Sequence, residues 1–256
     1  MGADRAVLDV TEDAVLGGRL RLRQPRKGHR VGHDAILLAA ACPARDGEHA
    51  VEFGAGIGSV GLALAARVPG LKMTLLEIDP ELCVLAADNA RLNSLAEQVD
   101  VRNLDVTNAD ELASALDPCG IDRVLMNPPF HDETRANLSP EPGRRRAYAA
   151  RPDTVALWIK SAGQLLSPGG TLSMIFRADG LGDLLGALGG EFGGIGILPV
   201  HPRADAPAIR VLLRAVKDSR APLEIHPALT LNDGNRPTEA AEAILREGAL
   251  LPLAQP

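Results

Sequence analysis

Aromatic side chains are scarce in this 256-residue sequence, which contains one Trp, one Tyr and four Phe. With so few of them, a hydrophobic core must be built mainly from Leu, Val, Ile and Ala. An aromatic residue in a loop is then uncommon for this composition. One of the four Phe, Phe130, follows two prolines in a segment of this kind.

Cysteine is also scarce, and its three residues are widely spaced. Cys42, Cys83 and Cys119 form no CxxC pair, which argues against a disulfide framework. The six histidines and three cysteines show no metal-ligand spacing, so the sequence predicts no metal site. We expect neutral, buried thiols in a reducing cytoplasm.

Long apolar runs and an excess of positive charge are missing as well. No stretch approaches the roughly 20 apolar residues of a membrane span, and residues 1–18 lack the apolar run of a secretory signal. The formal net charge of −6 argues against a general nucleic-acid coat, although a local basic patch can still bind phosphate. We therefore expect a cytoplasmic protein without a membrane span. The sequence leaves its oligomeric state open.

Strand-like and helix-like hydrophobic patterns alternate from about residue 34 onward. This alternation predicts an α/β fold with a mostly parallel sheet and helices on both faces. The last two strands could form an antiparallel pair, and residues 19–23 alternate like a half-exposed strand ahead of the main fold. The predicted strands are 51–53, 72–78, 99–104, 122–126, 171–176, 195–200 and 209–216, and the predicted helices are 34–41, 59–67, 80–92, 109–116, 154–166 and 181–188.

A glycine-rich loop follows the first of these strands. Gly54, Gly56 and Gly58 let the backbone turn tightly and approach a ligand closely, and the loop opens a helix. Glu77 ends the next strand, 21 residues after Gly56, where a carboxylate can accept hydrogen bonds from a ribose diol. Loop and acid together predict a cofactor that carries adenosine, either NAD or S-adenosylmethionine. A glycine turn that only packs a helix on a sheet is the alternative.

Two features favour S-adenosylmethionine. Glu52 precedes the first glycine, and the resulting ExGxGxG pattern resembles motif I of class I methyltransferases. Asp105, followed by Val106, ends the third strand, where that class places a carboxylate or amide against the adenine amino group. A simple helix cap is the alternative role for Asp105.

The segment Asn127-Pro128-Pro129-Phe130 lies at the carboxyl end of the fourth strand. An exocyclic amine such as adenine N6 is a poor nucleophile, because its lone pair is delocalised into the ring. The Asn127 side-chain oxygen and a loop carbonyl could accept hydrogen bonds from its two N–H groups, and prolines stiffen such a loop without adding donors. Phe130 could stack on a flipped-out base. This pattern resembles the signature of methyltransferases that act on adenine N6 or on glutamine nitrogen. A plain proline turn is the alternative.

The segments before and after these motifs narrow the resemblance to one family. Residues 19–30 carry six Lys or Arg and no acid and lead into Gly28-His29-Arg30-Val31-Gly32-His33-Asp34, and the tail reads Leu231-Asn232-Asp233-Gly234-Asn235-Arg236-Pro237. With the Asn-Pro-Pro-Phe loop, the chain resembles the bacterial valine-tRNA adenine N6-methyltransferases. The resemblance implies S-adenosylmethionine as cofactor and tRNA as partner.

The same resemblance implies further site residues. Asp34 would meet the cofactor ammonium group, with a helix N-cap as the alternative. Arg30 and the run Arg144, Arg145 and Arg146 would grip substrate phosphates, with solvated charges as the alternative.

We therefore predict a Rossmann-like class I methyltransferase fold, with a seven-stranded, mostly parallel sheet whose last strand is antiparallel. A small N-terminal extension, 1–33, would precede the domain 34–256. The cofactor residues would be Asp34, Glu52, Gly54, Gly56, Glu77, Asp105, Val106 and Asn127, and the catalytic residues Asn127, Pro128, Pro129 and Phe130. The remaining alternatives are methylation of a protein glutamine or a small-molecule oxygen, an NAD-dependent oxidoreductase, and an RNA-binding module without activity.

Overall fold

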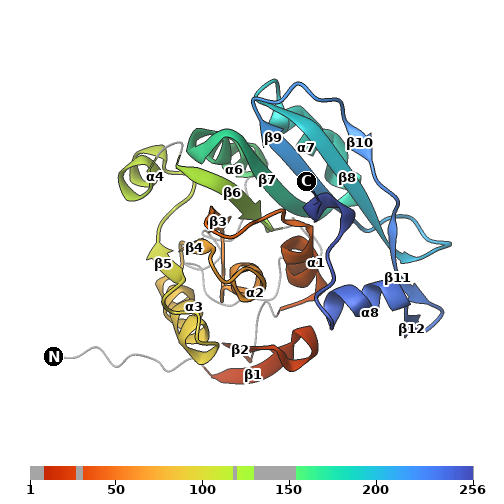
Figure 1. Ribbon diagram of the computed structural model, residues 1–256, viewed down its shortest axis with the longest axis horizontal. Coiled ribbons are helices and arrows are strands. Elements are labelled where there is room, and N and C mark those ends of the chain that lie inside the picture. The colour runs from red at the N-terminus through yellow and green to blue at the C-terminus, as the bar shows by residue number, and fades with distance from the viewer. Residues whose placement is uncertain (1–8, 27–30, 118–119, 130–153, 256) are drawn as a thin grey trace, which may run out of the picture.

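A ten-stranded sheet forms the centre of the computed structural model, which describes residues 9–26, 31–117, 120–129 and 154–255 (Figure 1). Its strands run in the order β12-β11-β8-β9-β7-β6-β3-β4-β5, and β10 also pairs with β8. The strands are β3 (His49–Phe53), β4 (Lys72–Glu77), β5 (Val99–Asn103), β6 (Ile121–Met126), β7 (Leu166–Arg177), β8 (Phe192–Arg203), β9 (Arg210–Lys217), β10 (Glu224–Ile225), β11 (Leu229–Asp233) and β12 (Arg236–Pro237).

The seven strands β3 to β9 are those that the sequence predicts. Strands β5, β4, β3, β6 and β7 pair in parallel, and β9 is antiparallel to both of its neighbours, β7 and β8. The prediction of a mostly parallel sheet with one antiparallel strand is therefore confirmed. The short strands β10, β11 and β12 extend the β8 edge and were not predicted; β10 and β12 have only two residues each, too few for a periodic signal.

Helices cover both faces of the sheet, and the buried hydrophobic residues form two clusters. Figure 1 shows α4, α6 and α7 above the sheet and α1, α2 and α3 below it. Strands β3, β4 and β6 are mostly buried because helices cover both of their faces, whereas the edge strand β5 is buried only at Val99. The helices are α1 (His33–Ala41), α2 (Ser59–Arg67), α3 (Pro80–Leu92), α4 (Ala109–Ala115), α6 (Thr154–Leu165), α7 (Leu181–Leu188) and α8 (Glu239–Leu245), with the 3-10 turns η1 (Leu16–Gly18), η2 (Ala178–Gly180) and η3 (Pro252–Ala254).

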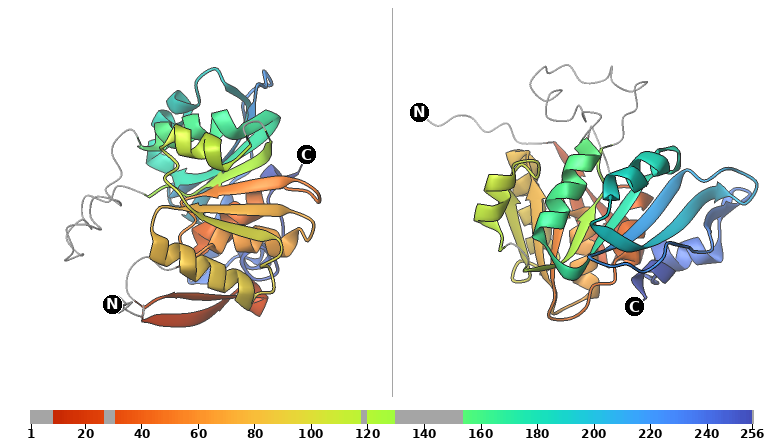
Figure 2. Two further views of the ribbon diagram at one scale, coloured as in Figure 1. Left: turned by 90° about the vertical axis from the view of Figure 1, so that its left-hand side faces the viewer. Right: turned by 90° about the horizontal axis from the view of Figure 1, so that it is seen from above.

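An antiparallel hairpin precedes this core. It consists of β1 (Val10–Val15) and β2 (Leu20–Pro25), and in β2 buried and exposed residues alternate as the sequence predicts. The hairpin lies along α3, as the left view of Figure 2 shows. It forms a two-stranded sheet of its own. A domain boundary at residue 33 stays a prediction.

Candidate active site

The carboxyl ends of four parallel strands bring the predicted residues to one edge of the sheet. Phe53 lies opposite both Leu76 and Met126, so the glycine loop after β3 is flanked by the ends of β4 and β6. Glu77 is the last residue of β4 and lies opposite Asn103 at the end of β5. This edge is where open α/β sheets bind their ligands.

The glycine loop requires glycine for two different reasons. Gly54, Gly56 and Gly58 have φ angles of 63°, 56° and 84°, a region that favours glycine. A Cβ on Gly54 would lie 2.5 Å from Cη2 of Trp158, whereas a Cβ on Gly56 would meet nothing within 4 Å. Trp158 is buried and packs edge-on against Phe53, with ring centroids 6.3 Å apart. Gly54 therefore fits the core beneath the loop, and Gly56 borders open space.

Glu77 is held in a fixed orientation beside this loop. Its Oε2 accepts a hydrogen bond of 2.8 Å from the Gly56 N–H, and its Oε1 accepts one of 2.9 Å from the Asp79 N–H. Cys83 Sγ donates to the Glu77 carbonyl, and burial raises the pKa of this thiol to about 11, which keeps it neutral. A carboxylate oxygen has two lone pairs, so each oxygen of Glu77 can accept one further hydrogen bond.

Glu52 lies inside the protein. Its side chain is 2% exposed, and its Oε2 accepts a hydrogen bond of 2.7 Å from the Gly61 N–H in the first turn of α2. Burial raises the pKa of this carboxyl to about 8; the nearby Glu77 adds to the rise and the Gly61 N–H opposes it. At neutral pH, Glu52 is therefore mostly a neutral acid that connects the end of β3 to α2.

Asp105 shapes the turn after β5. Its Oδ1 accepts hydrogen bonds from the Thr107 N–H at 2.8 Å and from Thr107 Oγ1 at 2.7 Å. The N-cap of α4 is Asn108, whose side chain accepts from the Glu111 N–H, so Asp105 is not the helix cap. Val106, the next residue, is buried.

Asn127 is the first residue after β6. It is half-buried, Pro128 is buried and Pro129 is exposed, while Phe130 lies outside the described residues. The preceding residue, Met126, lies opposite Phe53 of β3 and Met174 of β7. Asn127 therefore starts a loop directly beside the glycine loop, and the two prolines give this loop carbonyl acceptors without N–H donors.

Asp34 lies in the first turn of α1 and is ion-paired. The N-cap of α1 is Gly32, so Asp34 is not a cap. Arg210 Nε donates to Asp34 Oδ2 at 2.9 Å, and both side chains are 27% exposed. Arg210 lies opposite Arg177, the last residue of β7, which places Asp34 at the same edge as Asn127. The predicted phosphate contacts Arg30, Arg144, Arg145 and Arg146 lie outside the described residues.

Asn89 is a residue of the site that the sequence analysis missed. It is 0% exposed on α3, its Oδ1 accepts from the Arg23 N–H, and its Nδ2 donates to the Arg23 and Ile57 carbonyls. It thus connects the hairpin to the glycine loop. A single Asn among the apolar positions of residues 80–92 was the available signal, because a buried amide needs partners.

The described residues contain no group of three or more His, Cys, Asp or Glu side chains that could hold a metal ion. Among the helices of these same ranges, none is long and apolar enough to cross a membrane.

Comparison with known proteins gives a consistent result. Residues 29–193 match the sequence profile of the Methyltransferase small domain family. The chain is 33% identical over 161 residues to a tRNA1(Val) (adenine(37)-N6)-methyltransferase of Porphyromonas gingivalis, a match that covers 60% of this chain and 61% of that protein. The chain therefore spans less than two thirds of this curated relative.

Two solved structures are similar in fold. The crystal structure of a predicted O-methyltransferase, protein Atu636 from Agrobacterium tumefaciens, has a TM-score of 0.72 at 28% identity and covers 85% of this chain and 98% of its own. The Thermus thermophilus 16S rRNA N2 G1207 methyltransferase, solved with AdoMet and guanosine, has a TM-score of 0.59 at 20% identity and covers 81% of this chain and 50% of its own.

Proposed function

Since this chain belongs to the Methyltransferase small domain family, we propose that it transfers a methyl group from S-adenosylmethionine to an exocyclic amine, with adenine N6 of tRNA as the acceptor. The observation that carries the proposal is the position of Asn127, directly after β6 and beside the glycine loop. Of the two cofactors that the loop left open, family membership favours S-adenosylmethionine over NAD.

The residues at the edge fit this cofactor. Glu77, already oriented by Gly56 and Asp79, has two lone pairs left for the hydroxyls of a ribose. The open space beyond Gly56 allows a ligand to approach the backbone. Asp105 and Val106 would border the adenine, and Asp34 the ammonium group, with Arg210 sharing the Asp34 carboxylate. Glu52 would act indirectly, by fixing the loop to α2.

Asn127 and its loop would prepare the acceptor. The cofactor supplies a methyl group on a sulfonium, which is released as a thioether. The Asn127 side-chain oxygen and a loop carbonyl would accept hydrogen bonds from the two N–H groups of the amine, so that its lone pair points at the methyl carbon. Holding the two reactants in line accounts for much of the rate gain. The surplus proton leaves the amine after the N–C bond has formed, so no strongly basic side chain is required.

Methyl incorporation into RNA tests the proposal. The purified chain is incubated with radiolabelled S-adenosylmethionine and total tRNA, and the tRNA is then digested to nucleosides. We expect the label in N6-methyladenosine. Unlabelled tRNA that lacks this modification should compete, and tRNA that already carries it should not. Label in another nucleoside, or none in tRNA, would refute the proposed acceptor.

An oxygen acceptor on a small molecule is the second candidate, favoured by the similarity to the predicted O-methyltransferase from Agrobacterium tumefaciens over 98% of that chain. An oxygen nucleophile does not need two acceptors for N–H bonds. If it is the substrate, methyl transfer should persist in Asn127→Ala and should be insensitive to added tRNA.

A further inference from the structure

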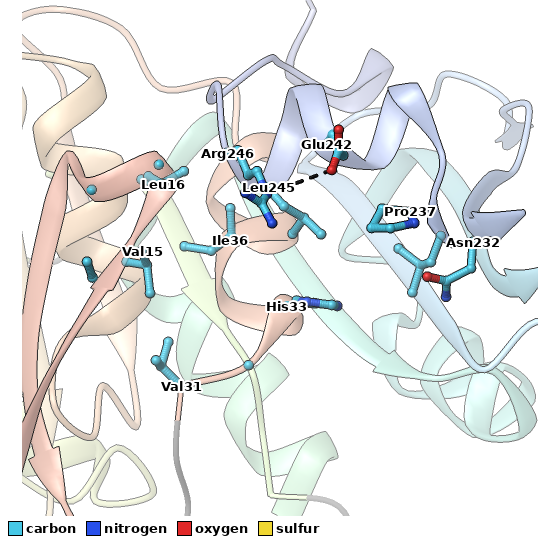
Figure 3. Close-up of a pocket in the computed structure, with 15 residues that line it drawn as sticks. Val15, Leu16, Val31, His33, Ile36, Asn232, Pro237, Glu242, Leu245 and Arg246 are labelled. Atoms are coloured by element: carbon cyan, nitrogen blue, oxygen red, sulfur yellow. Dashed lines mark ion pairs between the residues drawn. The ribbon is translucent and has the colours of Figure 1, made fainter. Parts of the chain in front are cut away.

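A groove of about 500 Å³ lies between three segments that are far apart in the sequence. Figure 3 shows the end of β1 and the turn η1 on one side, the start of α1 at the centre, and β11, β12 and α8 on the other side. This volume lies within the range of sites that bind small ligands or parts of larger ones.

The lining combines apolar walls with a few polar groups. Val15, Ile36 and Leu245 form part of the walls, and the polar side chains include His33 and Arg246 (Figure 3). One carboxylate, Glu242, also lines the groove, and it pairs with Arg246 at 3.9 Å. Aliphatic side chains can pack against the face of a nucleobase, and a guanidinium can donate hydrogen bonds to a phosphodiester.

The groove is preformed because its two sides are fastened together. Arg19 Nη2 donates a hydrogen bond of 2.8 Å to the Arg246 carbonyl at the end of α8. Gly17 has a φ of 64°, and a Cβ on it would lie 2.7 Å from this same oxygen. The hairpin turn therefore fits closely against α8. The Arg19 side chain does not line the groove, whose lining among the described residues carries one cation, Arg246, and one carboxylate, Glu242.

The groove includes residues next to Asp34, at the edge of the sheet that carries the candidate active site. Its central wall is the start of α1, which the Asp34–Arg210 ion pair holds at the carboxyl end of β7. Strand β7 is the neighbour of β6, and β6 ends directly before Asn127. A strand of RNA bound at Asn127 could therefore continue into the groove.

Most of the groove is built by elements outside the family's common region. The hairpin precedes residue 29 and α8 follows residue 193, the limits of the family match. Elements added around a shared catalytic core are where substrate recognition differs between relatives.

We propose that this groove binds a nucleotide adjoining the methylated adenine in the acceptor RNA. The base would lie against the apolar walls, and the Arg246 guanidinium would contact the phosphodiester. This proposal rests on the proposed function and adds where a neighbouring nucleotide of the tRNA would bind.

A charge reversal on an exposed side chain provides the first test. The Arg246 side chain is 71% exposed, and only its backbone carbonyl holds the hairpin, so Arg246→Glu should fold normally. We expect it to raise KM for tRNA about tenfold and to lower the salt dependence of tRNA binding by about one phosphate contact. The dissociation constant for S-adenosylmethionine should not change.

Arg91→Glu is the matched control. Arg91 lies on α3, is 67% exposed and also pairs with an acid of its own helix, Asp88, but it does not line the groove. It changes net charge equally and should leave KM for tRNA unchanged. Equal effects of the two variants would show that only overall charge matters, and would overturn the groove proposal.

Photo-crosslinking identifies the occupant. 4-Thiouridine is placed at single positions on either side of the methylated adenine in a tRNA stem-loop, and crosslinked peptides are sequenced. Crosslinks from at least one neighbouring position to residues 14–18 or 231–246 would support the proposal. If the stem-loop is methylated but crosslinks form only elsewhere, the groove proposal fails and the proposed function stands. If no tRNA is methylated, both fail.

Discussion

Asn127 is the residue on which the proposed chemistry depends most directly. Its side chain would accept a hydrogen bond from the amine, and its half-buried position after β6 places it beside the glycine loop. Alanine at this position keeps the backbone of the loop but removes the amide oxygen.

We therefore predict that Asn127→Ala lowers kcat for tRNA methylation by about 100-fold or more. Cofactor affinity should change far less, because Glu77 and the glycine loop are untouched. Single-turnover methyl transfer and equilibrium binding of S-adenosylmethionine measure the two effects. A variant with wild-type kcat would show that Asn127 does not orient the acceptor.

Glu52 makes the stability of the protein depend on pH. Its pKa is about 8 in the folded protein, against 4.5 as the ordinary value, so the folded state holds a proton that the unfolded state releases between these values. The free energy of unfolding therefore falls as pH rises through this window. Between about pH 6 and about pH 9 we expect a loss of about 3 kcal/mol from this group.

Glu52→Gln should remove this dependence. The amide oxygen can still accept from Gly61, and the side chain no longer ionises. Urea unfolding at both pH values should give a smaller decline for the variant than for the wild type. Glu111→Gln, which replaces an exposed carboxyl on α4, is the control and should follow the wild type. If the free energy of unfolding of Glu52→Gln fell as much as that of the wild type, Glu52 would not be the group responsible for the pH dependence.

At the scale of elements, the loop between β3 and α2 separates a structural glycine from a ligand-facing one. Gly54 and Gly56 have similar φ angles, 63° and 56°, so alanine adds similar backbone strain of about 1–2 kcal/mol at both. The surroundings differ, because a Cβ at Gly54 collides with Trp158 and one at Gly56 points into open space.

We predict that Gly54→Ala lowers stability by about 1–3 kcal/mol more than Gly56→Ala, through overpacking. Gly56→Ala should instead weaken S-adenosylmethionine binding more than its loss of stability explains. Thermal unfolding and calorimetric binding distinguish the two. Because Trp158→Leu is itself destabilising, a double-mutant cycle tests the collision: Gly54→Ala should cost less stability in the Trp158→Leu background, and an equal cost in both backgrounds would rule out the collision as the cause.

At the scale of the whole molecule, Asn89 of α3 and Asn93, the C-cap of the same helix, attach the hairpin to the core. Asn89 bonds to Arg23 and also to the Ile57 carbonyl in the glycine loop. Asn93, one turn later, bonds to both backbone groups of Arg21 and to the Asn89 carbonyl, without a contact to the loop. Comparing variants of the two asparagines therefore distinguishes attachment of the hairpin from support of the glycine loop.

We predict that Asn89→Ala costs more than about 2 kcal/mol of stability, because it leaves buried backbone groups without partners. It should also weaken cofactor binding. Asn93→Ala should loosen the hairpin, cost less and leave cofactor affinity near the wild-type value. Hydrogen exchange of residues 10–25 and cofactor titration measure these effects. Equal cofactor affinity in both variants would show that the hydrogen bond from Asn89 to the Ile57 carbonyl does not support cofactor binding.

Local patterns in the sequence determined the seven main strands, the helices between them and the residue types at the carboxyl ends of the parallel strands. Hydrophobic period, the glycines after β3 and the proline loop after β6 are short-range features, and parallel strands necessarily bring their carboxyl ends together. Glu77, Gly54, Gly56 and Asn127 could therefore be assigned to one edge before any tertiary contact was known.

Only the tertiary structure decided what these residues touch. Burial keeps Glu52 a neutral structural side chain rather than a charged group that binds a ligand. Arg210 pairs with Asp34, which is 176 positions away in the chain. Arg19 donates a hydrogen bond to the Arg246 carbonyl. Such contacts depend on how helices and strands pack, and no local period encodes the packing partner. The groove at the start of α1 exists for the same reason, since its walls come from both ends of the chain.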